Sequence, residues 1–248
     1  MWPRVNFTTA YFRILSAERL KMGKSPVWLL ILLSPLLALL IGLLSEPSGQ
    51  WEVLMSTMVF LHGMLLMPIL TGVFTSFVCR FEHAGGGWKQ MLVLPLTRTG
   101  VYAGKLTIVL LLLVGTQVLL LGSILLAGWI QGLTEPVPWA FIGGKLLLGL
   151  FACLPLAALQ MFVSLIWSSF AAPLALNFAL TVPNILIVNS ATFGPFYPWA
   201  QPMLLMTPTE GGGFGAYNVP LGTLLTVVGG SAVVFILIGV LYFRKKEI

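Results

Sequence analysis

Six long runs of apolar residues account for most of this chain and restrict what it can fold into. They cover residues 26–44, 53–79, 106–130, 139–167, 173–193 and 219–243. A helix needs about 20 apolar residues to cross a hydrocarbon core about 30 Å thick. Within lipid, runs of this length can satisfy their backbone hydrogen bonds only as helices. The sequence therefore predicts an all-α membrane protein with six transmembrane helices, folded as a single domain over residues 1–248.

The positions of the basic residues predict how these helices are oriented. Only 8% of the residues are charged, whereas soluble domains carry about a quarter. Twelve of the 13 Lys and Arg residues precede the first run, separate the second from the third, or follow the sixth, and Lys145 is the exception. Cytoplasmic loops carry the excess of Lys and Arg in membrane proteins. We therefore expect a multi-pass protein of the cell membrane with both termini in the cytoplasm, and no nucleic-acid partner.

The residues needed for an enzyme site are scarce in this chain. It contains no Asp, and all seven of its acidic residues are Glu. Cys79 and Cys153 lie far apart without a metal-ligand spacing, and two histidines without an assignable partner do not make a protease triad. None of the three Gly-Lys pairs completes the phosphate-binding pattern G-x-x-x-x-G-K-[ST]. We expect no catalytic residue, no metal site and no cofactor in this chain, so that any ATP hydrolysis belongs to a separate chain.

The segment before the first apolar run has an amphipathic helical pattern. Five apolar residues share one face at about 100° per residue, and they are Phe7, Tyr11, Ile14, Leu15 and Met22. Glu18 and Lys21 intrude on that apolar face. The pattern predicts an N-terminal amphipathic helix at the membrane interface, with a disordered basic tail as the alternative.

Residues 81–106, between the second and third runs, hold an unusual concentration of polar residues. Three large apolar side chains within them fall on one side of a short helix, and they are Trp88, Met91 and Leu92. Pro95 stops that helix, and Thr97 or Thr99 can cap the next one. A short helix that exposes such side chains needs a cover. Either the membrane surface or a partner protein could supply it.

This loop resembles the cytoplasmic loop of ABC-2 type permease subunits. The resemblance rests on Glu82, Gly87, Trp88, Lys89, Leu92, Pro95, Arg98, Gly104 and Lys105, which follow the family's order of an acidic residue, a small and aromatic stretch, L-P-x-[ST]-R and Gly-Lys. In that family the loop is a coupling helix that docks in a groove of the ATPase subunit. The resemblance thus implies that the ATPase-coupling residues are Glu82, Gly87, Trp88, Lys89, Met91, Leu92, Pro95, Arg98 and Lys105.

The same resemblance implies the partners and the class of cargo. The chain would be the permease of an ABC exporter and would pair with a second permease, identical or related. It would also bind two ATPase subunits that hold ATP and Mg. Its size is similar to lantibiotic-immunity and bacitracin-resistance permeases, which implies a hydrophobic or amphipathic substrate such as a peptide antibiotic. The alternative is a stand-alone secondary transporter or channel, which usually carries ionisable residues deep in the membrane; this chain offers Lys145 and His62.

The fifth apolar run carries polar residues that lie on one helical face. Asn177, Thr181 and Asn184 follow the spacing i, i+4, i+7, and Pro183 interrupts the backbone beside them. Asparagine in lipid needs a partner or water. These residues are therefore candidates for the substrate pathway or a dimer interface, with hydrogen bonds between helices as the alternative. For the Pro-, aromatic- and Gly-rich stretch 194–218 we weigh a re-entrant lid against a flexible loop.

Overall fold

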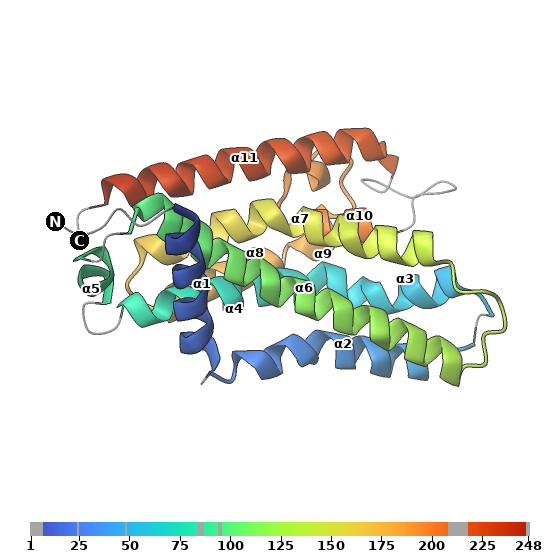
Figure 1. Cartoon of the computed structure of the whole chain (residues 1–248). Coiled ribbons are helices and arrows are strands. Elements are labelled where there is room, and N and C mark those ends of the chain that lie inside the picture. The colour runs from blue at the N-terminus through green and yellow to red at the C-terminus, as the bar shows by residue number, and fades with distance from the viewer. Residues whose placement is uncertain are drawn as a thin grey trace.

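Five long helices form the body of the molecule. The computed structural model describes residues 7–23, 25–47, 49–83, 87–93, 96–207 and 218–246, and every regular element within them is helical. Five helices are long and apolar enough to cross a membrane: Val27–Leu44 (α2), Trp51–His83, Arg98–Ile130 (α6), Trp139–Ile166 (α7) and Leu221–Lys245 (α11). They run alongside one another (Figure 1). The prediction of an all-α, multi-pass protein is confirmed.

The predicted fifth membrane helix, residues 173–193, is not continuous. The chain forms α8 (Ala171–Thr181), breaks at Val182 and Pro183, and resumes as the single turn α9 (Asn184–Ile187). Eleven residues of α8 reach only about 16 Å, about half of a hydrocarbon core. The break has a local cause, because Pro183 cannot donate a backbone hydrogen bond and its ring crowds the preceding turn. The expectation of six continuous spans is therefore corrected at this run.

After α9 the chain returns into the bundle. It passes through the 3₁₀ turn η2 (Gly194–Phe196) and the short helix α10 (Gln201–Met206), all six residues of which are buried. In Figure 1 the pieces from α8 to α10 lie between the end of α7 and the start of α11, which are at opposite ends of the bundle. Most of residues 194–207 are thus buried, while Phe196 is exposed, and the re-entrant lid stays a prediction. Residues 208–217 of the predicted lid lie outside the described residues.

The helix Trp51–His83 contains a wide turn near its middle. It consists of α3 (Trp51–Leu61), the π-helical turn η1 (His62–Leu66) and α4 (Met67–His83). Pro68 lies two residues after the end of the π turn and has no N–H for the carbonyl of Met64, four residues earlier. Such turns relieve local strain in the hydrogen-bond ladder. The π turn thus lies within two residues of the proline that interrupts the ladder.

The N-terminal helix α1 (Phe7–Gly23) crosses the bundle near one end instead of running along it (Figure 1). Ile14 and Met22 from its apolar face are buried in the core that α1 shares with α4 and α6. This confirms a helix with one buried face. The short helix α5 (Gly87–Val93) and the end of α11 lie at that same end of the bundle (Figure 1). Their cytoplasmic location remains a prediction.

Candidate functional site

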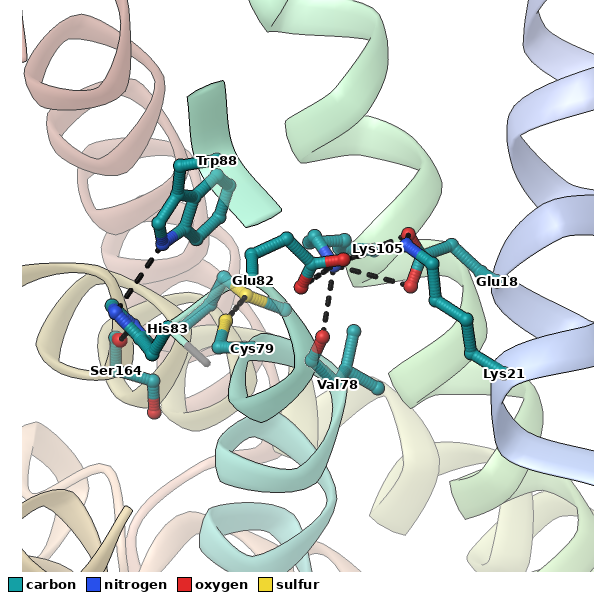
Figure 2. A network of polar contacts seen from close by, with 10 residues as sticks. Glu18, Lys21, Val78, Cys79, Glu82, His83, Trp88, Lys105 and Ser164 are labelled. Carbon is teal, nitrogen blue, oxygen red and sulfur yellow. Dashed lines mark hydrogen bonds and ion pairs between the residues drawn. The ribbon is translucent and has the colours of Figure 1, made fainter. Parts of the chain in front are cut away.

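A group of four charged side chains lies where α1, α4 and α6 meet. We name Glu18, Lys21, Glu82 and Lys105 the ionic quartet (Figure 2). Lys105 Nζ lies 3.1 Å from Glu18 Oε2 and 2.6 Å from Glu82 Oε2. It also donates to the carbonyl oxygen of Val78 at 2.8 Å. Lys21 Nζ closes the ring, at 2.9 Å from Glu18 Oε1 and 2.5 Å from Glu82 Oε1.

The ionic quartet is almost completely withdrawn from solvent. Glu18 and Lys105 are each 1% exposed and Glu82 is 2% exposed, while the Lys21 side chain is 31% exposed. Burial of an unpaired charge costs several kcal/mol, and a compensating partner must be held in good geometry. Here two carboxylates face two ammonium groups, so the four formal charges sum to zero. The arrangement ties three helices together through the buried Lys105, while Lys21 lies at its solvent-facing edge.

Lys21 shows the electrostatic balance within the quartet. Burial acts to lower the pKa of Lys21, but the charges of Glu18 and Glu82 and their hydrogen bonds act in the opposite direction. The net result is a pKa raised above the ordinary value of 10.5. Lys21 therefore keeps its proton throughout the physiological pH range.

The Gly-Lys pair at 104–105 allows α1 to pack closely enough on α6 for the ionic quartet to form. A Cβ atom on Gly104 would lie 2.5 Å from Ile14 Cγ2, closer than side chains approach one another. The glycine thus allows α1 to lie directly on α6. The next residue of α6, Lys105, then reaches Glu18 of α1, which lies one turn after Ile14.

The short helix α5 is held against the bundle by Trp88. Its ring is 6% exposed and its centre lies 5.1 Å from that of Phe243 and 5.6 Å from that of His83. Lys105 Nζ lies 5.6 Å from the same ring centre and Lys246 Nζ lies 6.0 Å from it, within the range of cation–π attraction. From the sequence, Trp88 was expected on an exposed side of the helix. That expectation was wrong: the ring is buried and fills the space between α4, α6 and α11.

His83 connects Trp88 to α7 and was not among the predicted site residues. Trp88 Nε1 donates to His83 Nδ1 at 3.3 Å, which leaves His83 Nε2 to donate to the carbonyl oxygen of Ser164 at 2.7 Å (Figure 2). Both bonds are satisfied only by the neutral imidazole with its proton on Nε2. Its signal in the sequence is weak: a histidine at the end of an apolar run, five residues before a tryptophan.

Arg98 ties the start of α6 to the end of α11. Its Nη1 donates to the carbonyl oxygens of Phe243, Arg244 and Lys246 at 3.3, 3.0 and 2.5 Å. Carbonyls in the last turn of a helix have no partner within the helix, and a cation there also favours the helix dipole. Thr97 accepts from the backbone N–H of Gly100 at 3.1 Å, so it is the N-cap of α6. The choice between Thr97 and Thr99 is thereby decided.

The remaining predicted coupling residues lie on α5 or next to it. Gly87 allows α5 to approach α4, since a Cβ there would lie 2.9 Å from the Cα of Glu82. Lys89 and Gln90 are exposed. Met91 and Leu92 belong to α5 by their backbone, but their side chains lie outside the described part of the chain, as does Pro95.

A groove of about 410 Å³ separates α1 from α5. Its walls include apolar side chains of both flanks, such as Ile14 and Phe81, and its floor includes Glu18 and Glu82 of the ionic quartet. Gln90 of α5 lines the same groove. The groove therefore opens directly beside the charges that join the three helices.

The polar residues predicted for the substrate pathway are all buried within the protein. Asn177, Thr181 and Asn184 are each 1% exposed or less. Asn177 Nδ2 donates to the carbonyl oxygen of Pro68 at 3.0 Å, and its Oδ1 accepts from Trp199 Nε1 at 2.9 Å. Thr181 donates to the backbone of its own helix, the carbonyl oxygen of Asn177, at 2.7 Å. In this conformation Asn177 joins α8 to α4 and to Trp199, whereas the bond of Thr181 stays within α8.

Asn184 compensates for the missing hydrogen bond at the π turn. Its Nδ2 donates to the carbonyl oxygen of Met64 at 2.7 Å and to that of Trp199 at 2.9 Å. Met64 is the residue whose carbonyl Pro68 cannot serve, because the proline nitrogen carries no hydrogen. The asparagine side chain thus satisfies a buried backbone acceptor in an apolar environment, where leaving it unpaired is costly.

Comparison with known proteins assigns the chain to a family. A search of curated proteins finds no match. The model of the ABC-2 family transporter proteins matches residues 14–184, more than two thirds of the 248 residues. The matched range contains residues 14–23 of α1, the ionic quartet, α5 and the two asparagines of α8 and α9. The chain therefore belongs to the ABC-2 family of transporter proteins and is the membrane-spanning permease component of an ABC transporter.

Proposed function

We propose that this chain is the permease subunit of an ATP-driven exporter and receives conformational energy from a separate ATPase through α5. Two ATPase subunits, which bind ATP and Mg, would serve two permease chains, identical or related. The family match supports an ABC ATPase partner. The end of the bundle that holds α1, α5 and the end of α11 would face the cytoplasm, where ATP is available.

The observation that carries this proposal is how α5 is connected to the membrane helices. Trp88 of α5 packs on Phe243 of α11 and, through His83, reaches the end of α7. Lys105 links the same ring to the ionic quartet and so to α1, α4 and α6. A displacement of α5 thus acts on five helices at once. A simple connector between two membrane helices would need none of these contacts.

The docking surface would be the exposed side of α5 together with the neighbouring groove. Lys89 and Gln90 are exposed there, and the groove beside them has apolar walls and a volume of about 410 Å³. Met91, Leu92 and Pro95 remain proposed coupling residues on the family resemblance. Trp88 faces the bundle, so it would transmit the movement of α5 to the membrane helices. The exposed residues of α5 would make the contact with the ATPase.

The proposed cargo is a hydrophobic or amphipathic molecule moved out of the membrane or the cell. A peptide antibiotic is the specific proposal, with self-immunity or resistance as its purpose. Asn177, Thr181 and Asn184 remain candidates for the pathway, and their contacts within the chain would then have to open during transport. A panel of peptide antibiotics, tested on cells with and without the chain and its ATPase, should show a selective rise in resistance to at least one of them. Equal sensitivity across the panel would exclude this class of cargo.

Coupling is tested by co-purifying the ATPase with variants and measuring ATP turnover stimulated by cargo. Lys89→Glu should weaken ATPase association, because it reverses a charge on the exposed side of α5. Trp88→Ala should retain much of the association but lower stimulated turnover about tenfold or more, since it removes the contact of α5 with α11 and α6. Trp139→Ala is the control, at an exposed tryptophan on the opposite end of the bundle. A chain that never co-purifies with an ATPase would instead favour a stand-alone secondary transporter or channel.

A further inference from the structure

A second groove lies on the other side of α1, away from α5. It has a volume of about 380 Å³ and is bounded by α1, the first turn of α2 and the middle of α6. Met22 and Leu112, which are 1% and 2% exposed, form its apolar floor. Phe12 and Leu111, which are 66% and 56% exposed, stand at its edges. The volume lies within the range of pockets that bind small molecules.

The polar edge of this groove is cationic. Arg19 and Ser16 line it from α1, and both are exposed. Arg13 lines the adjoining surface hollow, which shares Phe12 and Ser16 with the groove. Most other basic side chains at this end are engaged by the protein, as Arg98 and Lys105 are. Within the described ranges, Arg13 and Arg19 form no hydrogen bond or ion pair with a protein group.

Helix lengths place the groove at the edge of the hydrocarbon core. The 33 residues of α6 extend about 50 Å, roughly 20 Å more than the core needs, which corresponds to about 13 residues. If the exposed Trp129 marks the far interface, the near boundary falls close to Leu111. The 18 residues of α2 cover about 27 Å, so its second residue, Trp28, lies at the same boundary. Both residues line the groove.

We propose that this groove binds one anionic phospholipid of the membrane. The guanidinium group of Arg19 would pair with the phosphate, as its planar donors match phosphate oxygens. An acyl chain would lie against the exposed side chains of Phe12 and Leu111. Arg13 would add attraction for the anionic headgroup. The lipid would thus hold α1 against α2 and α6 at the boundary where headgroups meet hydrocarbon.

The faces of α1 support this assignment. At about 100° per residue, Phe12, Arg13, Ser16, Arg19 and Leu20 share the side opposite the buried residues. This exposed side carries two cations and two large apolar residues, a combination typical of helices bound to anionic membrane surfaces. The ionic quartet is on the buried side and is electrically neutral, so it does not compete for the headgroup.

The test is native mass spectrometry of the full chain after exchange into lipid discs of phosphatidylcholine alone or mixed with phosphatidylglycerol. One retained phosphatidylglycerol per chain, in preference to phosphatidylcholine, is expected. Arg19→Gln should lower the retained fraction about fivefold, which corresponds to about 1 kcal/mol. The control Arg244→Gln removes an exposed cation at the same end but away from the groove, and should leave retention unchanged.

A second variant tests the groove itself and not only the charge. Ser16→Phe adds a ring at an exposed position on the groove wall, and should displace the lipid while circular dichroism shows an intact helical content. Equal loss for Arg19→Gln and Arg244→Gln would show general surface attraction and overturn the proposal. Equal retention of the two lipids, or full retention by a folded Ser16→Phe variant, would overturn it as well.

Discussion

Replacing Lys105 by methionine is expected to be among the most damaging single changes at the end of the bundle that holds α5. Lys105→Met keeps the approximate volume of the side chain but removes its charge. It leaves Glu18 and Glu82 buried, with Lys21 as their remaining cation. The substitution removes two ion pairs, at 3.1 and 2.6 Å, and a hydrogen bond of 2.8 Å to the carbonyl oxygen of Val78.

The magnitude follows from the burial of the group. Removing one partner of a buried ion pair costs about 3–5 kcal/mol, because the other charge stays buried without compensation. Lys105 is 1% exposed, so solvent cannot replace it. Lys21 is the matched control within the same quartet: its side chain is 31% exposed, Lys105 still pairs with both carboxylates, and Lys21→Met should cost about 0–1 kcal/mol.

The assay is thermal unfolding of the purified chain in detergent, read as loss of helical signal. At about 2–4 °C per kcal/mol for a chain of this size, Lys105→Met should lower the midpoint by about 10 °C. The double variant Glu82→Gln with Lys105→Met restores neutrality and leaves the pair of Glu18 and Lys21. It should be less damaging than the sum of its single changes by about 1–3 kcal/mol. Strict additivity, or equal effects of the two lysine changes, would refute a cooperative buried quartet.

Three further outcomes are expected. Asn184→Ala should lower the free energy of unfolding by about 1–3 kcal/mol, since two buried carbonyls lose their donor. Asn189→Ala, at an exposed asparagine, should be nearly neutral, and equal thermal midpoints for the two variants would contradict this role of Asn184. Gly104→Val should loosen α1 from α6 and expose α1 to protease, because even a Cβ there meets α1; an unchanged digestion pattern would argue against close packing. A cysteine at Glu135 should react with an impermeant reagent added outside, and one at Lys89 only after permeabilisation; the reverse pattern would invert the predicted topology.

Much of the helical framework follows from local properties of the sequence. Hydropathy over about 20 residues is sufficient to find the long helices, and the predicted ranges agree with α2, α6, α7 and α11 to within several residues at each end. The short helix before Pro95 follows from residue type and spacing alone, and the same reasoning limited the cap of α6 to Thr97 or Thr99. The fifth run shows the limit of this reasoning. Its hydropathy was that of a membrane helix, but Pro183 and the hydrogen bonds of Asn184 to the carbonyls of Met64 and Trp199 favour a break.

The roles of individual site residues were decided by tertiary structure. The sequence showed Glu18 on the apolar face of α1 as an irregularity, and only the packing of α1 on α6 brings it to Lys105, 87 residues away. It likewise predicted an exposed Trp88, and only the packing of α5 on α4, α6 and α11 buries the ring. Hydropathy and periodicity are properties of neighbours along the chain, so the sequence by itself determined which segments are helical and which residues are out of place in them. Ion pairing and ring packing depend on the distance and register between helices, and these are set only when the helices pack together.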